Sequence, residues 1–253
     1  MTKILWITGA GKGIGRAVAW DYASRGWVVA VSARSSSDLK VLSEEARAAG
    51  LLGTIHPYVL DVTDEEAVVH TSRAVESDLG PLDQAILCAG IYVPNRPMDF
   101  DSALFRSHLE VNFLGCVNVL VAILPNLITR GCGHIGVVSS VAGYSGLPNA
   151  SAYGATKAAL INMCESLKTE LDGLGVGISV INPGFVRTPL TDKNDFSMPF
   201  LMEAKDAARC IYLGMEKGKF EIAFPTIFVM LLKFLRILPY ALYFPLVKKV
   251  MLR

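Results

Sequence analysis

The sequence predicts an α/β fold with a parallel, doubly wound sheet of about seven strands and helices on both faces. Three observations carry this expectation. Short β-rich runs alternate with longer helical patterns, a glycine-rich turn joins the first run to the first helical pattern, and 52% of the 253 residues are hydrophobic. Strands separated by helices form right-handed βαβ units, which cover both faces of a sheet. The hydrophobic share excludes an intrinsically disordered chain.

Strands and helices are expected to alternate along the first 221 residues. We expect strands at Ile4–Thr8, Val28–Ser32, Thr54–Leu60, Gln84–Cys88, His134–Ser139, Gly177–Asn182 and Glu221–Phe224. We expect helices near Gly13–Arg25, Ser37–Ala49, Glu65–Asp78, Asp101–Thr129, Ala150–Leu174 and Ala204–Lys217. No linker rich in Pro, Gly or Ser divides this stretch. Residues 1–225 are therefore expected to form one domain and residues 226–253 a C-terminal tail.

One long segment, Arg187–Phe200, has no periodicity and carries Pro189 and Pro199. Long loops of this kind often lie over a binding site and select its ligand. We expect this loop, with the apolar stretch Met198–Met202, to cover a site.

Charge, cysteines and histidines exclude several classes of protein. The formal net charge of +1 gives no indication of nucleic-acid binding. The five cysteines are odd in number and form no CxxC pair, and the four histidines have no HxxH spacing, so neither a disulfide scaffold nor a metal site is predicted. The apolar part of the N-terminus is too short for a signal peptide, so we expect the domain to be cytoplasmic.

The glycine-rich turn predicts a dinucleotide site. The segment Thr8–Gly15 follows the first strand and opens the first helix. Gly9 permits a sharp turn, Gly13 lets the backbone approach a pyrophosphate, and Gly15 permits close packing of the helix on the strand. The N-terminus of the helix then stabilises the phosphate charge. The expected contacts from the turn are Gly9, Gly11, Lys12, Gly13, Ile14 and Gly15.

The end of the second strand favours NADP(H) over NAD(H). An acid about 20 residues beyond the turn would bind the ribose 2′-hydroxyl. The second predicted strand here is followed by Ala33 and Arg34, and neither is an acid. The Arg34 guanidinium and the Lys12 ammonium are suited to a 2′-phosphate. The alternative is that both are solvated surface residues.

A second pattern carries catalytic chemistry. Tyr153 and Lys157 are four residues apart near the start of a predicted helix, so they share one face. Ser140 lies 13 residues before Tyr153, at the end of a predicted strand. Since the carboxyl ends of parallel strands form the ligand crevice, the three side chains are expected to meet beside the glycine turn.

Together these motifs resemble the short-chain dehydrogenase/reductase family and its Rossmann-type fold. The resemblance rests on TGAGKGIG, Asp61-Val62, Ala89-Gly90, Asn112, Ser139-Ser140, YGATK and NPGFVRT, which occur in the family's order over roughly residues 3–224. It implies that Tyr153 is the general acid–base, that Lys157 and the oxidised nicotinamide lower the pKa of Tyr153, and that Lys157 holds the nicotinamide ribose. It further implies that Ser140 orients the substrate carbonyl and that Asn112 holds a water for proton relay. Asp61 would contact adenine, Val186 and Thr188 would flank the carboxamide, and Val62, Ala89, Gly90, Pro183 and Gly184 would line the cofactor site.

One position departs from the family pattern. The family usually has Asn-Ala-Gly after the fourth strand, and this chain has Cys88-Ala89-Gly90. A thiol is a weak hydrogen-bond partner, so the local contacts of Cys88 are in question while the cofactor prediction is not.

The tail is apolar and basic. From Ile222 to Arg253 there is no Asp or Glu, and Lys233, Arg236, Lys248, Lys249 and Arg253 give a charge of +5, which leaves 1 − 5 = −4 for residues 1–221. Its uncharged runs are too short to span a bilayer, and Pro239 is expected to separate two helices, the second near Tyr240–Leu252. In the first, Ile227, Leu231, Leu235 and Leu238 are expected to share an apolar face. Three roles stay open: peripheral membrane contact, an oligomer interface, or packing over the substrate pocket. The tail resembles that of membrane-associated family members such as 3-ketosphinganine reductases or hydroxysteroid dehydrogenases.

The sequence therefore predicts an NADP(H)-dependent oxidoreductase that interconverts a ketone or aldehyde and an alcohol on an apolar substrate. By resemblance, the long helices 101–129 and 150–174 pair between subunits, and we expect a homodimer or homotetramer. The alternative is a regulator or scaffold that binds the cofactor without turnover, because fold does not fix function. A methyltransferase of the same fold is a weaker alternative, since its chemistry has no need of the Tyr153–Lys157 pair.

Overall fold

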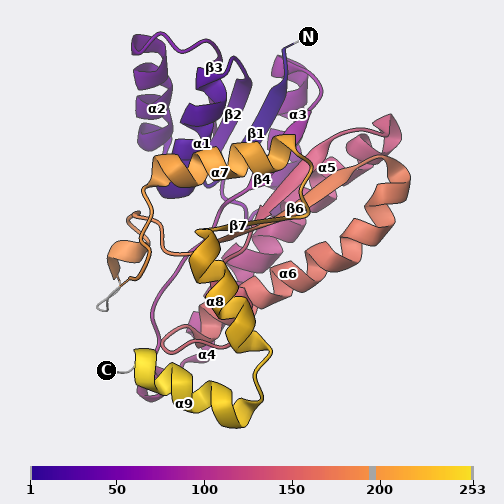
Figure 1. Cartoon of the computed structure of the whole chain (residues 1–253). Coiled ribbons are helices and arrows are strands. Elements are labelled where there is room, and N and C mark those ends of the chain that lie inside the picture. The colour runs from indigo at the N-terminus through magenta and orange to yellow at the C-terminus, as the bar shows by residue number, and fades with distance from the viewer. Residues whose placement is uncertain (1, 194–197, 252–253) are drawn as a thin grey trace.

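Seven parallel strands form the centre of the molecule (Figure 1). In this computed structural model, which describes residues 2–193 and 198–251, the strand order is β3-β2-β1-β4-β5-β6-β7. The strands are β1 (Ile4–Thr8), β2 (Val28–Ala33), β3 (Thr54–Val59), β4 (Gln84–Leu87), β5 (His134–Val138), β6 (Gly177–Pro183) and β7 (Glu221–Phe224). The order reverses between β1 and β4, so the chain winds outward in both directions. The predicted α/β fold is confirmed.

Helices cover both faces of the sheet. They are α1 (Gly13–Ser24), α2 (Ser36–Ala48), α3 (Glu65–Leu79), α4 (Ser102–His108), α5 (Gly115–Arg130), α6 (Ser151–Leu171), α7 (Ala204–Glu216), α8 (Thr226–Arg236) and α9 (Tyr240–Met251). Residues of α1, α2 and α7 belong to one hydrophobic cluster, and residues of α3, α5 and α6 belong to the other. In β1, Ile4 and Trp6 face the α3–α5–α6 side while Leu5 and Ile7 face the α1–α2–α7 side. A strand buried on both sides is expected to be apolar, and β1 is apolar up to its last residue, Thr8.

The predicted helix over 101–129 has a different local geometry. A π-helical turn, Leu109–Leu114, lies between α4 and α5. Its wider turn rotates the backbone relative to a regular α-helix. The turn contains Asn112, whose side chain is 1% exposed and hydrogen-bonds with the backbone of Ile91. Within the described residues, Ser102–Arg130 is also the one helical stretch long and apolar enough to span a bilayer. Its Val119 and Ile123 lie in the core, as in a core helix of a globular domain.

The tail folds into α8 and α9, which extend beyond the sheet at the end away from the N-terminus (Figure 1). Pro239 lies between them, as expected. Phe228 and Val229 of α8 are buried against the core. Lys233 of α8 pairs with Glu221 at the start of β7, and the Tyr243 hydroxyl of α9 donates to the Gly146 carbonyl at 2.8 Å.

The apolar face expected for α8 is divided between core and solvent. Ile227 and Leu231 are exposed, whereas Leu235 and Leu238 are partly buried. The side of α8 that packs on the core carries Phe228, Val229 and Leu232 instead.

Candidate active site

A cleft of 590 Å³ opens at the carboxyl edge of the sheet, near the point where the strand order reverses. Such switch points are where open α/β sheets bind ligands. All the residues expected to contact the cofactor line it: Gly9, Gly11, Lys12, Gly13, Ile14, Gly15, Arg34, Asp61, Val62, Ala89, Gly90, Tyr153, Lys157, Pro183, Gly184, Val186 and Thr188. Ser140 lines it as well.

The glycine turn has no room for a side chain at Gly9 or Gly15. Gly9 has φ +71°, and a Cβ atom there would lie 2.6 Å from the Ala89 nitrogen at the end of β4. A Cβ atom on Gly15 would lie 2.4 Å from the Gly9 carbonyl oxygen. The first backbone bond of α1 runs from Arg16 to Lys12, so the amides of residues 13–15 precede the helical ladder. This glycine cradle at a helix N-terminus fits a pyrophosphate.

Three charged residues gather where β2 ends. Arg34 and Lys12 line the cleft, as expected, and so does Asp38, which the sequence analysis did not consider. The Lys12 ammonium lies 3.5 Å from the Asp38 carboxylate. The Asp38 amide donates to Ser35, which caps α2, so the start of α2 brings an acid to this end of the cleft. A search beyond Arg34 for a capping Ser followed by an acid would have found it.

Tyr153 and Lys157 come from the first two turns of α6. The Lys157 ammonium donates to the Val138 carbonyl at 2.8 Å, and it lies 5.5 Å from the centre of the Tyr153 ring. Val138 is the last residue of β5, so this bond fixes α6 to the carboxyl edge. The Ser139 hydroxyl donates to the Lys157 carbonyl at 2.7 Å and adds a second tie.

Ser140 faces Tyr153 from the loop after β5. Its hydroxyl accepts a bond from the Ala142 amide at 3.1 Å and donates to the Pro183 carbonyl at 3.4 Å. Hydrogen bonding from Ser140 acts to lower the pKa of the Tyr153 phenol. Ser140, Tyr153 and Lys157 are therefore brought together at one end of the cleft.

Burial controls both titrating groups. It raises the pKa of Tyr153 to about 12, and the bond with Ser140 offsets only part of that rise. Burial also lowers the pKa of Lys157 to about 8. Lowering of the Tyr153 pKa by Lys157 was expected, but among the protein's own groups burial dominates, because desolvation disfavours the charged form of both residues.

Asn112 lies behind the cleft rather than in its wall. Its side-chain oxygen accepts the Ile91 amide at 2.7 Å, and its nitrogen donates to the Ile91 carbonyl at 3.0 Å and to Thr156 at 3.2 Å. It lines a separate cavity of 10 Å³ together with Val138 and Ala89. That volume suits about one water molecule.

Asn95 was not identified from the sequence. It is 4% exposed, and its side chain donates to the Ser151 hydroxyl at 2.6 Å and accepts the Ala152 amide at 3.4 Å. It therefore caps the N-terminus of α6, two residues before Tyr153, although it lies 56 residues earlier than Ser151 in the chain. The Tyr92 ring from the same loop meets the Tyr153 ring edge to face, with 5.1 Å between centres.

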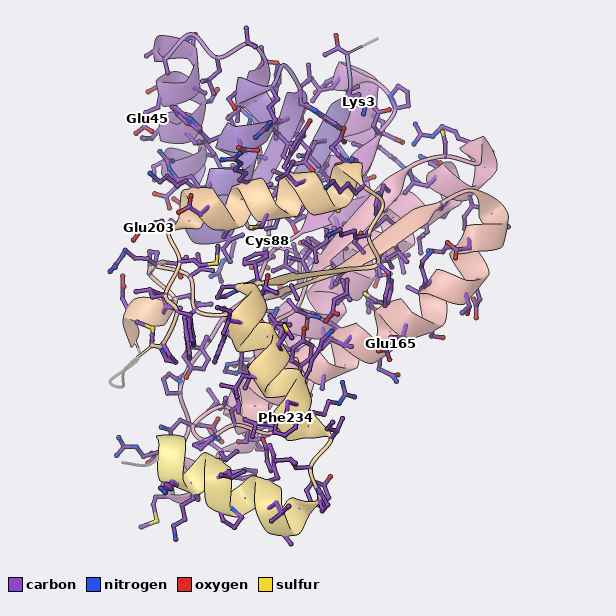
Figure 2. The ribbon with its side chains drawn as sticks, in the orientation of Figure 1. Lys3, Glu45, Cys88, Glu165, Glu203 and Phe234 are labelled. Atoms are coloured by element: carbon purple, nitrogen blue, oxygen red, sulfur yellow. The ribbon has the colours of Figure 1, made fainter. Side chains whose placement is uncertain are left out.

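Cys88, directly after β4, contacts the glycine turn. It lies in the middle of the molecule (Figure 2), and a backbone hydrogen bond from Gly15 reaches it. Burial raises its pKa to about 11, against the smaller opposing effects of Lys157 and Gly15. At neutral pH Cys88 is therefore a packed thiol and a poor nucleophile. Among the described residues no group of three His, Cys, Asp or Glu side chains could hold a metal.

The loop after β6 closes one side of the cleft. Thr188, Pro189, Leu190 and Thr191 line it. Beyond the loop, the Met202 amide donates to the Phe185 carbonyl and the Arg187 amide donates to the Met202 carbonyl, both at 2.9 Å. The apolar stretch Met198–Met202 is thus tied to the site at its end. Residues 194–197 of the loop predicted at Arg187–Phe200 lie outside the described residues.

The chain is similar to known oxidoreductases. Residues 3–197 match the short-chain dehydrogenase family. The chain is 37% identical over 237 residues to an uncharacterized oxidoreductase of Myxococcus xanthus, covering 94% of this chain and 93% of that protein. It is 35% identical over 196 residues to the 3-oxoacyl-acyl-carrier-protein reductase FabG of Thermotoga maritima, covering 76% and 77%. Among solved structures, ElxO with NADP bound has a TM-score of 0.79 at 27% identity, covering 88% of this chain and 98% of that one.

The buried Lys157 makes a prediction for stability. Its pKa is about 8 in the folded protein, against an ordinary value of 10.5. Between these values the unfolded chain binds more protons, so the free energy of unfolding rises with pH. In urea titrations, the free energy of unfolding of wild type should rise between pH 7.5 and pH 10 by about 2.5 kcal/mol more than that of Lys157→Met. Lys168→Met, which removes a partly exposed ammonium paired with Asp172 on the same helix, should follow wild type. Parallel pH dependence of wild type and Lys157→Met would contradict the burial argument.

Proposed function

The chain belongs to the short-chain dehydrogenase/reductase family, and from this premise we propose that it is an NADP(H)-dependent enzyme that interconverts an apolar ketone or aldehyde and its alcohol. The observation that carries the proposal is the convergence of Ser140, Tyr153 and Lys157 on one end of the glycine-lined cleft. A protein that only bound the cofactor would have no need of this trio.

The residues of the cleft fit a phosphorylated dinucleotide. The glycine cradle suits its pyrophosphate, and Arg34 and Lys12 suit a 2′-phosphate, although Asp38 offsets one of their two charges. Such a cofactor supplies the hydride, and the protein supplies binding, orientation and the proton.

Tyr153 is suited to act as the acid in carbonyl reduction. With a pKa of about 12 it is protonated at neutral pH, and its hydroxyl gives that proton to the substrate oxygen as the carbonyl is reduced. Ser140 donates a hydrogen bond to the same oxygen, and Lys157 stabilises the phenolate that remains. Asn112, beside a cavity of one-water size, is placed to return a proton through water.

An aromatic cluster makes the wall of the cleft apolar from behind, which suits an apolar substrate. Phe185 follows the Pro183-Gly184 wall of the cleft, and its ring stacks on Phe228 of α8 with 5.5 Å between centres. Phe200 lies 6.0 Å from Phe228. A Cβ atom on Gly184 would lie 2.9 Å from the Phe228 ring, so α8 backs the cleft wall directly. The related FabG, by its name a reductase of 3-oxoacyl chains, points to the same substrate chemistry.

Replacing Tyr153 tests the mechanism. Tyr153→Phe removes the acid and should lower kcat for ketone reduction by about 10²–10⁴ while NADPH affinity changes little. Steady-state NADPH oxidation and fluorescence titration measure the two quantities. Tyr58→Phe on β3, which removes a hydroxyl that hydrogen-bonds to Asp78 of α3, is the matched control and should keep wild-type turnover. If Tyr153→Phe turned over at the wild-type rate, Tyr153 would not be the acid.

Replacing Arg34 tests the cofactor. Arg34→Ala should lower the affinity for NADPH by about tenfold to a hundredfold, because a charge-assisted hydrogen bond contributes about 1.5–3 kcal/mol. The affinity for NADH, which lacks the 2′-phosphate, should fall by less than about threefold. The control is Arg73→Ala on the exposed side of α3. Equal losses for both cofactors would show that Arg34 does not bind the phosphate.

We also propose that the enzyme is a homodimer or homotetramer, as family members commonly are. Leu114, Val121 and Ile128 are exposed at seven-residue intervals along α5 and its preceding turn. A two-fold interface uses one patch twice, and this stripe can pair with its own copy. Val121→Lys should lower the mass measured by light scattering, whereas Val41→Lys on α2 should not. An unchanged mass in Val121→Lys would place any interface elsewhere. Cytoplasmic location stays a prediction.

A further inference from the structure

The outer surface of the tail is apolar although the tail is already anchored. On its inner side α8 buries Phe228 and Val229, and α9 buries Tyr243 and Val247. Nine other large apolar side chains of these helices and their connection remain exposed: Ile227, Met230, Leu231, Phe234, Ile237, Tyr240, Leu242, Phe244 and Leu246, each between 43% and 76%. We call these nine residues the tail surface; Figure 2 marks Phe234 on it. Exposed large apolar side chains that gather on two neighbouring helices mark an interaction site.

Charge separates the candidate partners. Arg236, Lys248 and Lys249 are exposed at the ends of the two helices, and no acid occurs from residue 222 to the end of the sequence. In a symmetric contact between two tails, these cations would lie opposite the same cations of the second tail, and neither tail has a carboxylate to pair with them. A bilayer with anionic headgroups instead offers hydrocarbon to the apolar residues and phosphate to the cations. The long side chains of Lys and Arg can extend from the hydrocarbon to the phosphates.

Length decides how the helices would meet a bilayer. Helices α8 and α9 have 11 and 12 residues, which gives about 17 and 18 Å at 1.5 Å per residue. A bilayer core is about 30 Å thick, so neither helix spans it. Each helix is also tied to the domain, α8 through Lys233–Glu221 and α9 through Tyr243–Gly146. The pair can lie in the interface without leaving the fold.

We propose that the tail surface docks the protein peripherally on an anionic lipid bilayer. Docking here would bring the catalytic cleft near the lipid, because α8 begins at the carboxyl end of β7 and Phe228 backs Gly184 in the cleft wall. An apolar substrate dissolved in the bilayer would then lie near its site. The docking itself does not depend on turnover.

Vesicle flotation of the full chain tests the docking. The probes are vesicles of phosphatidylcholine alone and of phosphatidylcholine mixed with phosphatidylglycerol. Wild type should float with the mixed vesicles and bind the neutral ones at least about tenfold more weakly. Met230→Ser with Phe234→Ser should lower the partition coefficient on mixed vesicles about tenfold. Lys248→Gln with Lys249→Gln should lower it by a similar factor, and less so at high salt.

Matched controls lie at the opposite, amino edge of the sheet. Leu52→Ser removes an 84% exposed leucine before β3, and Lys217→Gln with Lys219→Gln removes two exposed cations before β7. Both should float like wild type. Every variant is scored only if it binds NADPH with wild-type affinity, which establishes folding independently of lipid and of turnover.

Two results would overturn the proposal. One is wild type that stays unbound on mixed vesicles, and the other is tail variants that float as well as wild type. If wild type does not float and Met230→Ser with Phe234→Ser loses oligomer mass, the surface is assigned to contact with a second copy of the chain. Loss of flotation with full ketone reductase activity would separate docking from catalysis and leave the proposed function intact.

Discussion

A buried ammonium held by one carbonyl organises the catalytic end of this protein. The side chain of Lys157 donates to Val138, the last residue of β5, and Val138 is free to accept because its strand ends there. An unpaired buried cation costs several kcal/mol, so this bond constrains where α6 can lie. Tyr153, one turn earlier on α6, is fixed by the same constraint. Ser140, two residues after Val138, then meets Tyr153 from the sheet side.

The parallel sheet supplies the rest of the site through the same edge. The ends of β1, β4, β5 and β6 lead into the glycine turn, Ala89-Gly90, Ser140 and Pro183-Gly184, all of which line one cleft. Close approach makes this possible, since Gly9 touches the backbone at Ala89 and leaves no room for a side chain. The tail also packs at this edge, because α8 follows the carboxyl end of β7 and places Phe228 behind Gly184.

Much of this arrangement could be predicted from local sequence. Strands β1 and β7 were predicted at their observed bounds, β1 because a buried parallel strand is a nearly continuous apolar run. The Tyr153–Lys157 spacing and the glycine turn are local patterns as well. Features that depend on distant parts of the chain were not predictable in this way. Asn95 caps a helix that starts 56 residues later, and the raised pKa of Tyr153 reflects burial by surroundings that no spacing reveals. The division of α8 into a packed and an exposed apolar side likewise depends on the core it meets.

The central claim is that the cleft reduces carbonyl groups rather than merely binding a cofactor. Transfer of deuterium from NADPH labelled at the nicotinamide C4 position tests it most directly, with a panel of apolar aliphatic, steroid and sphingoid ketones and product analysis by mass spectrometry. The account predicts an alcohol carrying one deuterium on the former carbonyl carbon for at least one member of the panel. Saturating NADPH binding with no deuterium in any product would contradict it and would favour a cofactor-binding regulator.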